Sequence, residues 1–420
     1  MMGGSRETGT GPLRTVTSAG IAVTAIALYA FVVLVAVPEG SPSPLARVVA
    51  LAVIVFAAAL ALAIARWAPA WLRASAMLPL GFASIAVLGG VVAKRVVTGV
   101  SLGGTLGVVA GIAGIALVVQ GWQRVLRPIA RRWIRVSVAV VFSLLVAQFA
   151  LLPAVFALDA TNRPRPLGSG RVPADVGLAF EDVRITTPDG TTLAAWWVPS
   201  HNGAAVVLLP GAGSTRSAVI DHAALLARRG YGALLLDWRG HGRSAGRSME
   251  FGWGFEADVR SAVSFVLDRP DVTDEVGILG LSLGAEIGLA TAGQDPRIAA
   301  VVAEGATARS WADARLEPDP HPVGYANEWL MFSLVAILAP EPEPLPLIEA
   351  IPLIRGPILL IAGEPTNEQK LAPLHAAAAP DLVTLWSVPD APHTQALRTH
   401  RVAYEERVVS FFDAALLEAG

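Results

Sequence analysis

The chain has 420 residues and a formal net charge of −2, with 54% hydrophobic and 16% charged residues. Soluble domains carry about 25% charged residues, so this composition predicts that part of the chain lies in lipid. The charge gives no support for a nucleic-acid partner, and the lack of cysteine excludes disulfides, thiolate zinc sites and a cysteine nucleophile. The length suits two or three domains.

Apolar runs without charged residues dominate the first 158 residues. About 20 apolar residues cross a bilayer as a helix, and helices satisfy their own backbone there. A secretory signal peptide would explain only the first run. We therefore predict a membrane domain of about five helices over residues 1–158. The runs are Thr17–Val37, Val48–Ala65, Ala74–Ala93, Val96–Gln123 and Val136–Leu158.

Basic residues near the span ends predict the orientation. With five spans, the side of the membrane that holds the N-terminus carries nine of these basic residues and the opposite side carries six. This difference favours a cytoplasmic N-terminus and an extracytoplasmic C-terminal domain. If the third run does not span, that domain moves to the cytoplasm. The runs contain no charged residue. A transporter usually needs ionisable groups in its spans, so an anchor in the lipid bilayer is the better interpretation.

The rest of the chain changes in character. Residues 159–178, rich in Pro, Gly and Arg, are typical of a linker, and a β-hairpin is expected around Pro188-Asp189-Gly190. Short apolar strands then alternate with helix-like segments, which predicts an α/β domain with a mostly parallel sheet over residues 179–420. The expected strands are Ala205–Leu209, Ala233–Leu236, Val276–Leu279, Ala299–Ala303, Ile358–Ala362 and Val383–Val388, and the expected helices include Ser217–Arg229, Phe255–Leu267 and Gly284–Gly293.

Ser282 stands in the motif Gly280-Leu281-Ser282-Leu283-Gly284, after an expected strand and at the start of an expected helix. A nucleophile elbow requires this strand–turn–helix setting. Glycines at 280 and 284 leave room for the tight turn. Ser282 is therefore the candidate nucleophile.

A serine hydroxyl needs a base within hydrogen-bond reach. His393 lies in a loop between the last expected strand and the terminal helix, in the chain order Ser…acid…His. His400 is the nearest rival, at the expected start of that helix. Backbone N–H groups of Leu283 and Ala212 are the candidate oxyanion donors, because one follows the nucleophile and the other lies in the loop after the strand Ala205–Leu209.

The acid that orients the histidine is less clearly marked. The loop after Ile358–Ala362 contains Glu364 and Glu368 but no aspartate. We favour Glu368 over Glu364, with Glu304 at the end of the strand Ala299–Ala303 as a third option. Asp390 lies so near His393 in sequence that a role in shaping the loop is the better interpretation.

Together these residues resemble the α/β-hydrolase superfamily, in particular its dienelactone-hydrolase-like and serine-aminopeptidase-like branches. The resemblance covers about Val183 to Leu417 and includes the Arg-Gly-x-Gly-x-Ser motif at Arg239–Ser244. It implies a cofactor-free Ser–His–acid hydrolase of carboxylic esters, thioesters or amides. Two positions depart from the family pattern: Pro210 begins the oxyanion loop where histidine is frequent, and Thr366 stands where aspartate is expected.

The resemblance also implies a lid over the active site within residues 305–356, where the apolar run Trp329–Leu338 could line an acyl pocket or touch the bilayer. A packed helix with a proline-rich return is the plain alternative.

The leading hypothesis is a membrane-anchored esterase or thioesterase acting on a small acyl or lipid-like substrate, with an acyltransferase or peptidase behind it. A non-catalytic binding or sensory protein, or a transporter with an appended domain, are the alternatives from other classes.

Overall fold

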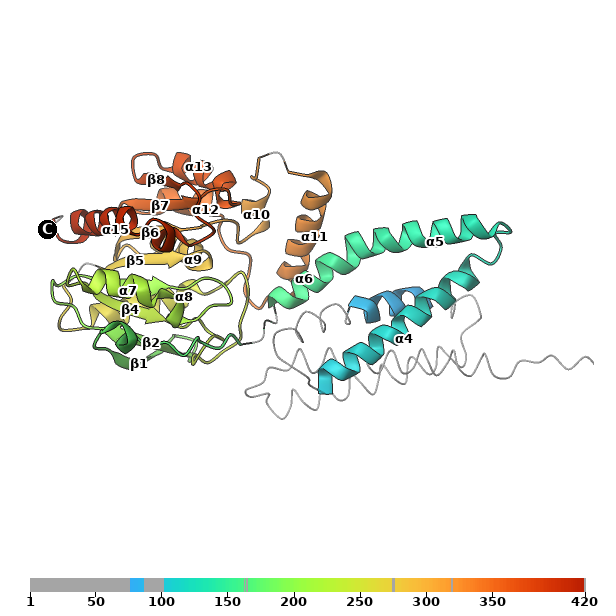
Figure 1. Ribbon diagram of the computed structural model, residues 1–420, viewed down its shortest axis with the longest axis horizontal. Coiled ribbons are helices and arrows are strands. Elements are labelled where there is room, and N and C mark those ends of the chain that lie inside the picture. Colours follow the sequence, from blue (N-terminus) through green and yellow to red (C-terminus); the bar gives the residue numbers. More distant parts are fainter. Residues whose placement is uncertain are drawn as a thin grey trace, which may run out of the picture. The chain divides into compact units, whose positions relative to one another are not determined.

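The computed structural model describes residues 76–86, 102–161, 163, 165–273, 276–318 and 320–418 (Figure 1). The chain divides into two compact units, Met1–Asp159 and Ala160–Gly420. The first two expected spans lie outside the described residues, and so do parts of the third and of the fourth.

The described part of the first unit is helical. It contains the helix Ala76–Ala86, α4 (Leu102–Val125) and α5 (Arg132–Val146), which continues through the π-helical turn η1 (Ala147–Leu151) into α6 (Leu152–Thr161). Helix Ala76–Ala86 packs closely on α4, since a Cβ added to Gly114 would lie 2.7 Å from the Gly81 carbonyl oxygen. Small residues such as Gly114 thus allow the two helices to pack closely at this position.

Within the described residues, one helix, Arg132–Thr161, is long and apolar enough to cross a membrane by its length and composition.

The second unit is built on an eight-stranded sheet with the order β1-β2-β4-β3-β5-β6-β7-β8. Strand β2 pairs antiparallel with both β1 and β4, and all other pairs are parallel. The mostly parallel sheet predicted from the sequence is therefore confirmed. The strands are β1 (Glu181–Thr186), β2 (Thr192–Val198), β3 (Ala205–Leu209), β4 (Gly232–Leu236), β5 (Val276–Leu281), β6 (Ile298–Glu304), β7 (Ile358–Gly363) and β8 (Val383–Val388).

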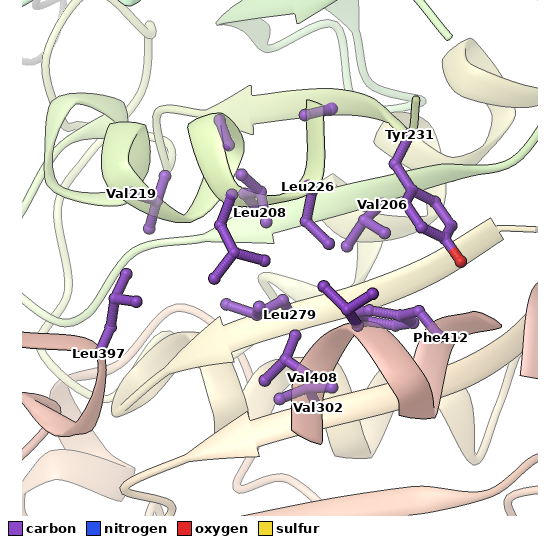
Figure 2. Close-up of a cluster of buried hydrophobic side chains, with 14 of the residues drawn as sticks. Val206, Leu208, Val219, Leu226, Tyr231, Leu279, Val302, Leu397, Val408 and Phe412 are labelled. Carbon is purple, nitrogen blue, oxygen red and sulfur yellow. The ribbon is translucent and has the colours of Figure 1, made fainter. Parts of the chain in front are cut away.

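One face of the sheet is covered by α7 (Ile220–Ala227) and α15 (Arg401–Leu416). Alternate strand residues such as Leu208 and Leu279 point to this face and meet Leu226 of α7 and Phe412 of α15 (Figure 2). Side chains one position away point to the other face, because successive residues of a strand alternate. Both faces are apolar, which explains why these strands are uninterrupted hydrophobic runs.

The opposite face carries α8 (Glu256–Leu267) and α9 (Leu283–Ala292). A Cβ added to Gly288 of α9 would lie 2.8 Å from Cγ2 of Ile278, so this glycine lets the helix approach the sheet closely. Helix α13 (Glu368–Ala378) lies beside β7 and β8. The short elements η2 (Pro173–Val176), η3 (Arg216–Val219) and α14 (Ala396–Thr399) complete the unit outside residues 305–356.

Residues 305–356 form a helical excursion between β6 and β7. It consists of α10 (Trp311–Ala314), α11 (Pro322–Leu338), α12 (Leu347–Ala350) and η4 (Ile351–Leu353). Phe332 and Val335 of α11 are buried, whereas Trp329 and Ile337 are exposed. Helix α11 thus packs by one side only, and a proline-rich segment returns the chain to the sheet.

Candidate active site

Ser282 occupies a sharp turn between β5 and α9. Its φ of 52° and ψ of −119° lie in a region that non-glycine residues rarely adopt. The turn depends on its glycines: a Cβ on Gly280 would lie 2.2 Å from the Gly284 carbonyl oxygen, and one on Gly284 would lie 2.2 Å from the Leu209 carbonyl oxygen. The local sequence therefore fits the strained strand-to-helix turn that holds a nucleophile above a sheet.

His393 lies between Ser282 and Glu368. Its Nε2 is 2.9 Å from Ser282 Oγ, and its Nδ1 is 3.0 Å from Glu368 Oε2. The three residues come from three elements: the turn after β5, the loop after β8, and the first turn of α13. The structure thus brings together the serine, the histidine and the favoured one of the three glutamates singled out in the sequence.

The hydrogen bonds define the tautomer of His393. An ionised carboxylate can only accept, so Nδ1 carries the proton and donates to Glu368, which leaves Nε2 to accept the Ser282 hydroxyl. This bond to Glu368 raises the pKa of His393. Burial of Glu368 by itself would raise the pKa of that carboxyl. The hydrogen bonds from His393, from Thr366 and from the backbone N–H of Glu368, together with the charge of His393, outweigh burial, so the pKa is lowered. Glu368 is therefore an anion that favours the imidazolium form of His393.

Glu364 and Glu304 take other positions. Across the described residues, no hydrogen bond or ion pair joins Glu364 to His393; its backbone N–H donates to the carbonyl of Val388. Glu304 is buried and accepts from the backbone N–H of Ala396 at 2.9 Å. Thr366 stands where the family pattern has aspartate, and the contact with His393 comes instead from Glu368, two residues later at the start of α13.

The loop that carries His393 is strained on both sides. Asp390 and Thr394 have φ values of 53° and 54°, and with Ser282 they are the three non-glycine residues with positive φ in the part of the chain that the structure describes. Such strain concentrates at functional sites. The positive φ of Asp390 fits the prediction that this residue shapes the loop. His400, the rival histidine, is hydrogen-bonded to Thr399 and precedes α15.

The candidate oxyanion donors flank the serine. Leu283 is the first residue of α9, so its N–H has no partner inside the helix. Ala212 lies in the turn after β3, where a Cβ on the adjacent Gly211 would lie 3.4 Å from Ser282 Cβ. This closeness brings the Ala212 loop to the same edge of the sheet as the serine. Within the described residues, no group of three or more His, Asp or Glu side chains could hold a metal ion.

The comparisons with known proteins concern this second unit. Residues 200–338 match the family described as "Serine aminopeptidase, S33". An esterase of Pyrococcus furiosus has a similar structure over 60% of this chain and 97% of its own, with a TM-score of 0.51 and 23% sequence identity. The C-terminal unit has the α/β-hydrolase fold.

Two curated proteins are similar in sequence to part of this chain. An uncharacterised protein of Mycobacterium tuberculosis is 30% identical over 204 residues, which is 48% of this chain and 65% of that protein. A polyketide transferase of Stachybotrys chlorohalonatus is 38% identical over 129 residues, which is 29% of this chain and 43% of that protein. The chain therefore spans less than two thirds of the length of these two relatives.

The Arg-Gly-x-Gly-x-Ser motif of the hydrolase-fold unit has a structural role. Arg239 pairs with Asp258 and Asp189, and the Ser244 hydroxyl donates to the carbonyl of Asp237 at 2.6 Å. The same hydroxyl accepts from the backbone N–H of Ala194 at 2.8 Å. The motif thus connects the loop after β4 to β2 and to α8 by hydrogen bonds and an ion pair.

Two residues beside the candidate site of the hydrolase-fold unit were not expected from the sequence. Trp238 donates its indole N–H to the carbonyl of Pro210 at 2.8 Å, which fixes the start of the Ala212 loop. Gly305 has a φ of 74° and follows β6 directly, against the His393 ring. Gly305 directly follows an expected strand, at the carboxyl edge of the sheet where ligands bind, and this position could have indicated a place in the site. No local pattern marks Trp238 as a partner of Pro210.

Proposed function

We propose that this protein is a serine hydrolase that cleaves a carboxylic ester or thioester through an acyl-enzyme. The observation that carries the proposal is the pair of contacts of His393, 2.9 Å to Ser282 Oγ and 3.0 Å to Glu368 Oε2, beside a strained serine. Nucleophile, base and orienting group in mutual hydrogen-bond reach are what activates a serine hydroxyl. The names of similar proteins, an esterase and a polyketide transferase, agree with acyl chemistry.

In the proposed reaction, Ser282 Oγ attacks the acyl carbonyl while His393 Nε2 accepts the hydroxyl proton. The N–H groups of Leu283 and Ala212 stabilise the oxyanion of the tetrahedral intermediate. His393 then donates the proton to the leaving alcohol or thiol, and the acyl group stays on Ser282. Water attacks the acyl-enzyme with His393 again as base, which releases the acid and restores the serine. Glu368 holds the imidazole and stabilises its cation throughout.

We further propose that the N-terminal helices anchor the protein in a bilayer and that the hydrolase-fold unit is extracytoplasmic. Support comes from the helix Arg132–Thr161 and from α5, in which no residue is buried. Exposed apolar side chains on a helix this long suit lipid better than water. An anchored enzyme whose residues 305–356 include the apolar helix α11 suits a lipid-like or acyl substrate, and residues 305–356 would then act as the lid.

The chemistry is tested by labelling the detergent-solubilised full chain with a fluorophosphonate probe. We expect Ser282→Ala to abolish labelling and His393→Ala or Glu368→Gln to slow it by about 100-fold or more. Glu364→Gln is the matched control, because it changes a glutamate of the same loop that does not contact His393, and it should label like the wild type. Folded wild-type protein that neither labels nor hydrolyses p-nitrophenyl esters would favour a non-catalytic binding protein.

The anchor and its orientation need a separate experiment. We expect the full chain to stay in the membrane fraction after alkaline carbonate washing. A protease added outside intact cells or spheroplasts should remove a C-terminal tag. Release by carbonate would contradict the anchor, and a protected tag would place the hydrolase-fold unit in the cytoplasm.

A further inference from the structure

Glu304 connects the nucleophile and the base through two separate groups. Its backbone carbonyl oxygen accepts the N–H of Ser282 at 2.7 Å, as part of the pairing between β5 and β6. Its side-chain Oε1 accepts the N–H of Ala396 at 2.9 Å, three residues after His393. One residue at the end of β6 is thus bound to the turn of the serine and to the loop of the histidine.

The surroundings of the Glu304 side chain are unusual for a carboxyl group. The residue is 2% exposed, and its second oxygen, Oε2, has no hydrogen-bond partner among the residues that the structure describes. The hydroxyl of Tyr404 on α15 is also fully buried and interacts with this carboxyl. Burial raises the pKa of Glu304 to about 7, while Tyr404 lowers it and the Glu304 charge contributes to raising the pKa of Tyr404.

Burying a carboxyl group is unfavourable. A buried glutamate at position 304 is therefore explained best by an interaction that an apolar side chain could not make. The well-formed hydrogen bond that this side chain accepts comes from the backbone N–H of Ala396, in the loop of the base. That loop is strained at Asp390 and Thr394, and His393 itself is 44% exposed, so packing alone holds it weakly. A hydrogen-bond acceptor fixed at the end of a central strand supplies the restraint that the loop lacks.

We infer that Glu304 is a positioning residue, whose side chain holds the His393 loop at the end of β6, beside the strand β5 that carries the nucleophile turn. This inference rests on the proposed serine-hydrolase function. Glu304 acts through Ala396 and does not replace Glu368, since His393 Nδ1 is already bonded to Glu368 Oε2. The requirement is for an acceptor oxygen at this point and not for a negative charge.

The test uses the full chain in detergent, with p-nitrophenyl acetate as substrate and a fluorophosphonate as active-site probe. Glu304→Leu removes the acceptor at similar volume, and Glu304→Gln keeps a carbonyl oxygen there. Glu304→Asp keeps the carboxyl but shortens its reach by one methylene, and serves if the leucine variant does not fold. Asp295→Leu is the matched control: Asp295 is a buried carboxylate that accepts a backbone N–H, from Arg297, just before the opposite end of β6.

We expect kcat and the rate of labelling to fall by about 10- to 100-fold in Glu304→Leu or Glu304→Asp, because a small displacement of the base slows the chemical step. KM should stay unchanged, and Glu304→Gln should recover a rate within about threefold of the wild type, since its side chain still accepts a hydrogen bond. Asp295→Leu should react like the wild type.

Wild-type rates in both Glu304→Leu and Glu304→Asp would overturn the inference, and so would a glutamine variant as slow as the leucine variant. An equal loss in Asp295→Leu would show a general effect on the fold and would also overturn it. A wild-type protein that neither labels nor turns over would instead refute the proposed function.

Discussion

Gly305 lies against the imidazole of His393: a Cβ added to Gly305 would approach His393 Cε1 to 2.9 Å and Nδ1 to 3.1 Å. Glycine is needed here for two reasons: a side chain would collide with the imidazole, and a φ of 74° is unfavourable for other residues. We expect Gly305→Ala to displace the imidazole and to lower the labelling rate by about tenfold or more.

The control for this prediction is Gly177→Ala. Gly177 has a similar φ of 77°, but a Cβ there would meet nothing within 4 Å. Both substitutions introduce left-handed strain of about 1 kcal/mol, so the loss of thermal stability from strain should be comparable. Full activity in Gly305→Ala, or an equal loss of activity in both variants, would contradict a steric role for Gly305.

The pH dependence of the proposed reaction follows from the charges around His393. The hydrogen bond to Glu368 raises the pKa of His393 above its ordinary value of 6.5, and the charges of Glu368, Glu286 and Glu304 act in the same direction. Only neutral His393 can accept the serine proton, so activity should rise with pH through a midpoint above 6.5.

Glu368→Gln removes both the hydrogen bond to an anion and the charge. The midpoint of kcat/KM against pH should therefore move to lower pH, while the maximal rate falls. A midpoint that does not move in Glu368→Gln would show that Glu368 does not control the protonation of His393.

Glu304 should also leave a signature in stability. Its pKa is raised from 4.5 to about 7 in the folded state, with His393, Glu368 and Tyr404 as its ionisable neighbours. As the pH rises from about 4.5 to about 7, the unfolded chain releases the Glu304 proton first, so the folded state loses stability in this window.

Glutamine at 304 cannot ionise. As the pH rises from 5 to 8, the wild type should therefore lose stability relative to Glu304→Gln. The expected loss in its free energy of unfolding is on the order of 1–3 kcal/mol. Urea unfolding of both proteins at the two pH values measures this change. A difference that is the same at both pH values would mean that Glu304 titrates normally.

Trp238 provides a test of the Ala212 loop. Its indole N–H is bonded to the Pro210 carbonyl, whereas the buried indole nitrogen of Trp197 has no hydrogen-bond partner among the described residues. Trp238→Phe leaves the buried carbonyl unpaired and should reduce stability by about 1–3 kcal/mol beyond the effect of lost volume. Trp197→Phe loses similar volume but no hydrogen bond.

We also expect Trp238→Phe to slow labelling, because the loop that it fixes carries the proposed oxyanion donor Ala212. Trp197→Phe should label at the wild-type rate. Equal stability and equal labelling in the two variants would show that the Trp238 bond does not hold the loop.

Local sequence determined much of the C-terminal unit. The strand Ala205–Leu209 and the strand Val383–Val388 have the bounds expected from their apolar runs. The turn at Ser282 is encoded by its own neighbours, because Gly280 and Gly284 are the residues that the tight turn needs. Features of this kind depend on residues adjacent in the chain, and a sequence displays them directly.

Only the tertiary structure decided which acid meets the histidine. Glu364 and Glu368 are four residues apart in the segment that follows β7, and both are compatible with the chain order of the fold. Ser282 and His393 are 111 residues apart, and their contact depends on the pairing of β5 through β8 and on the packing of α13. The functions of Gly305 and Glu304 likewise arise from the approach of two distant segments. Sequence alone thus determined the residue types and their local turns, while long-range packing decided which of them touch, because contact between distant segments depends on the whole sheet.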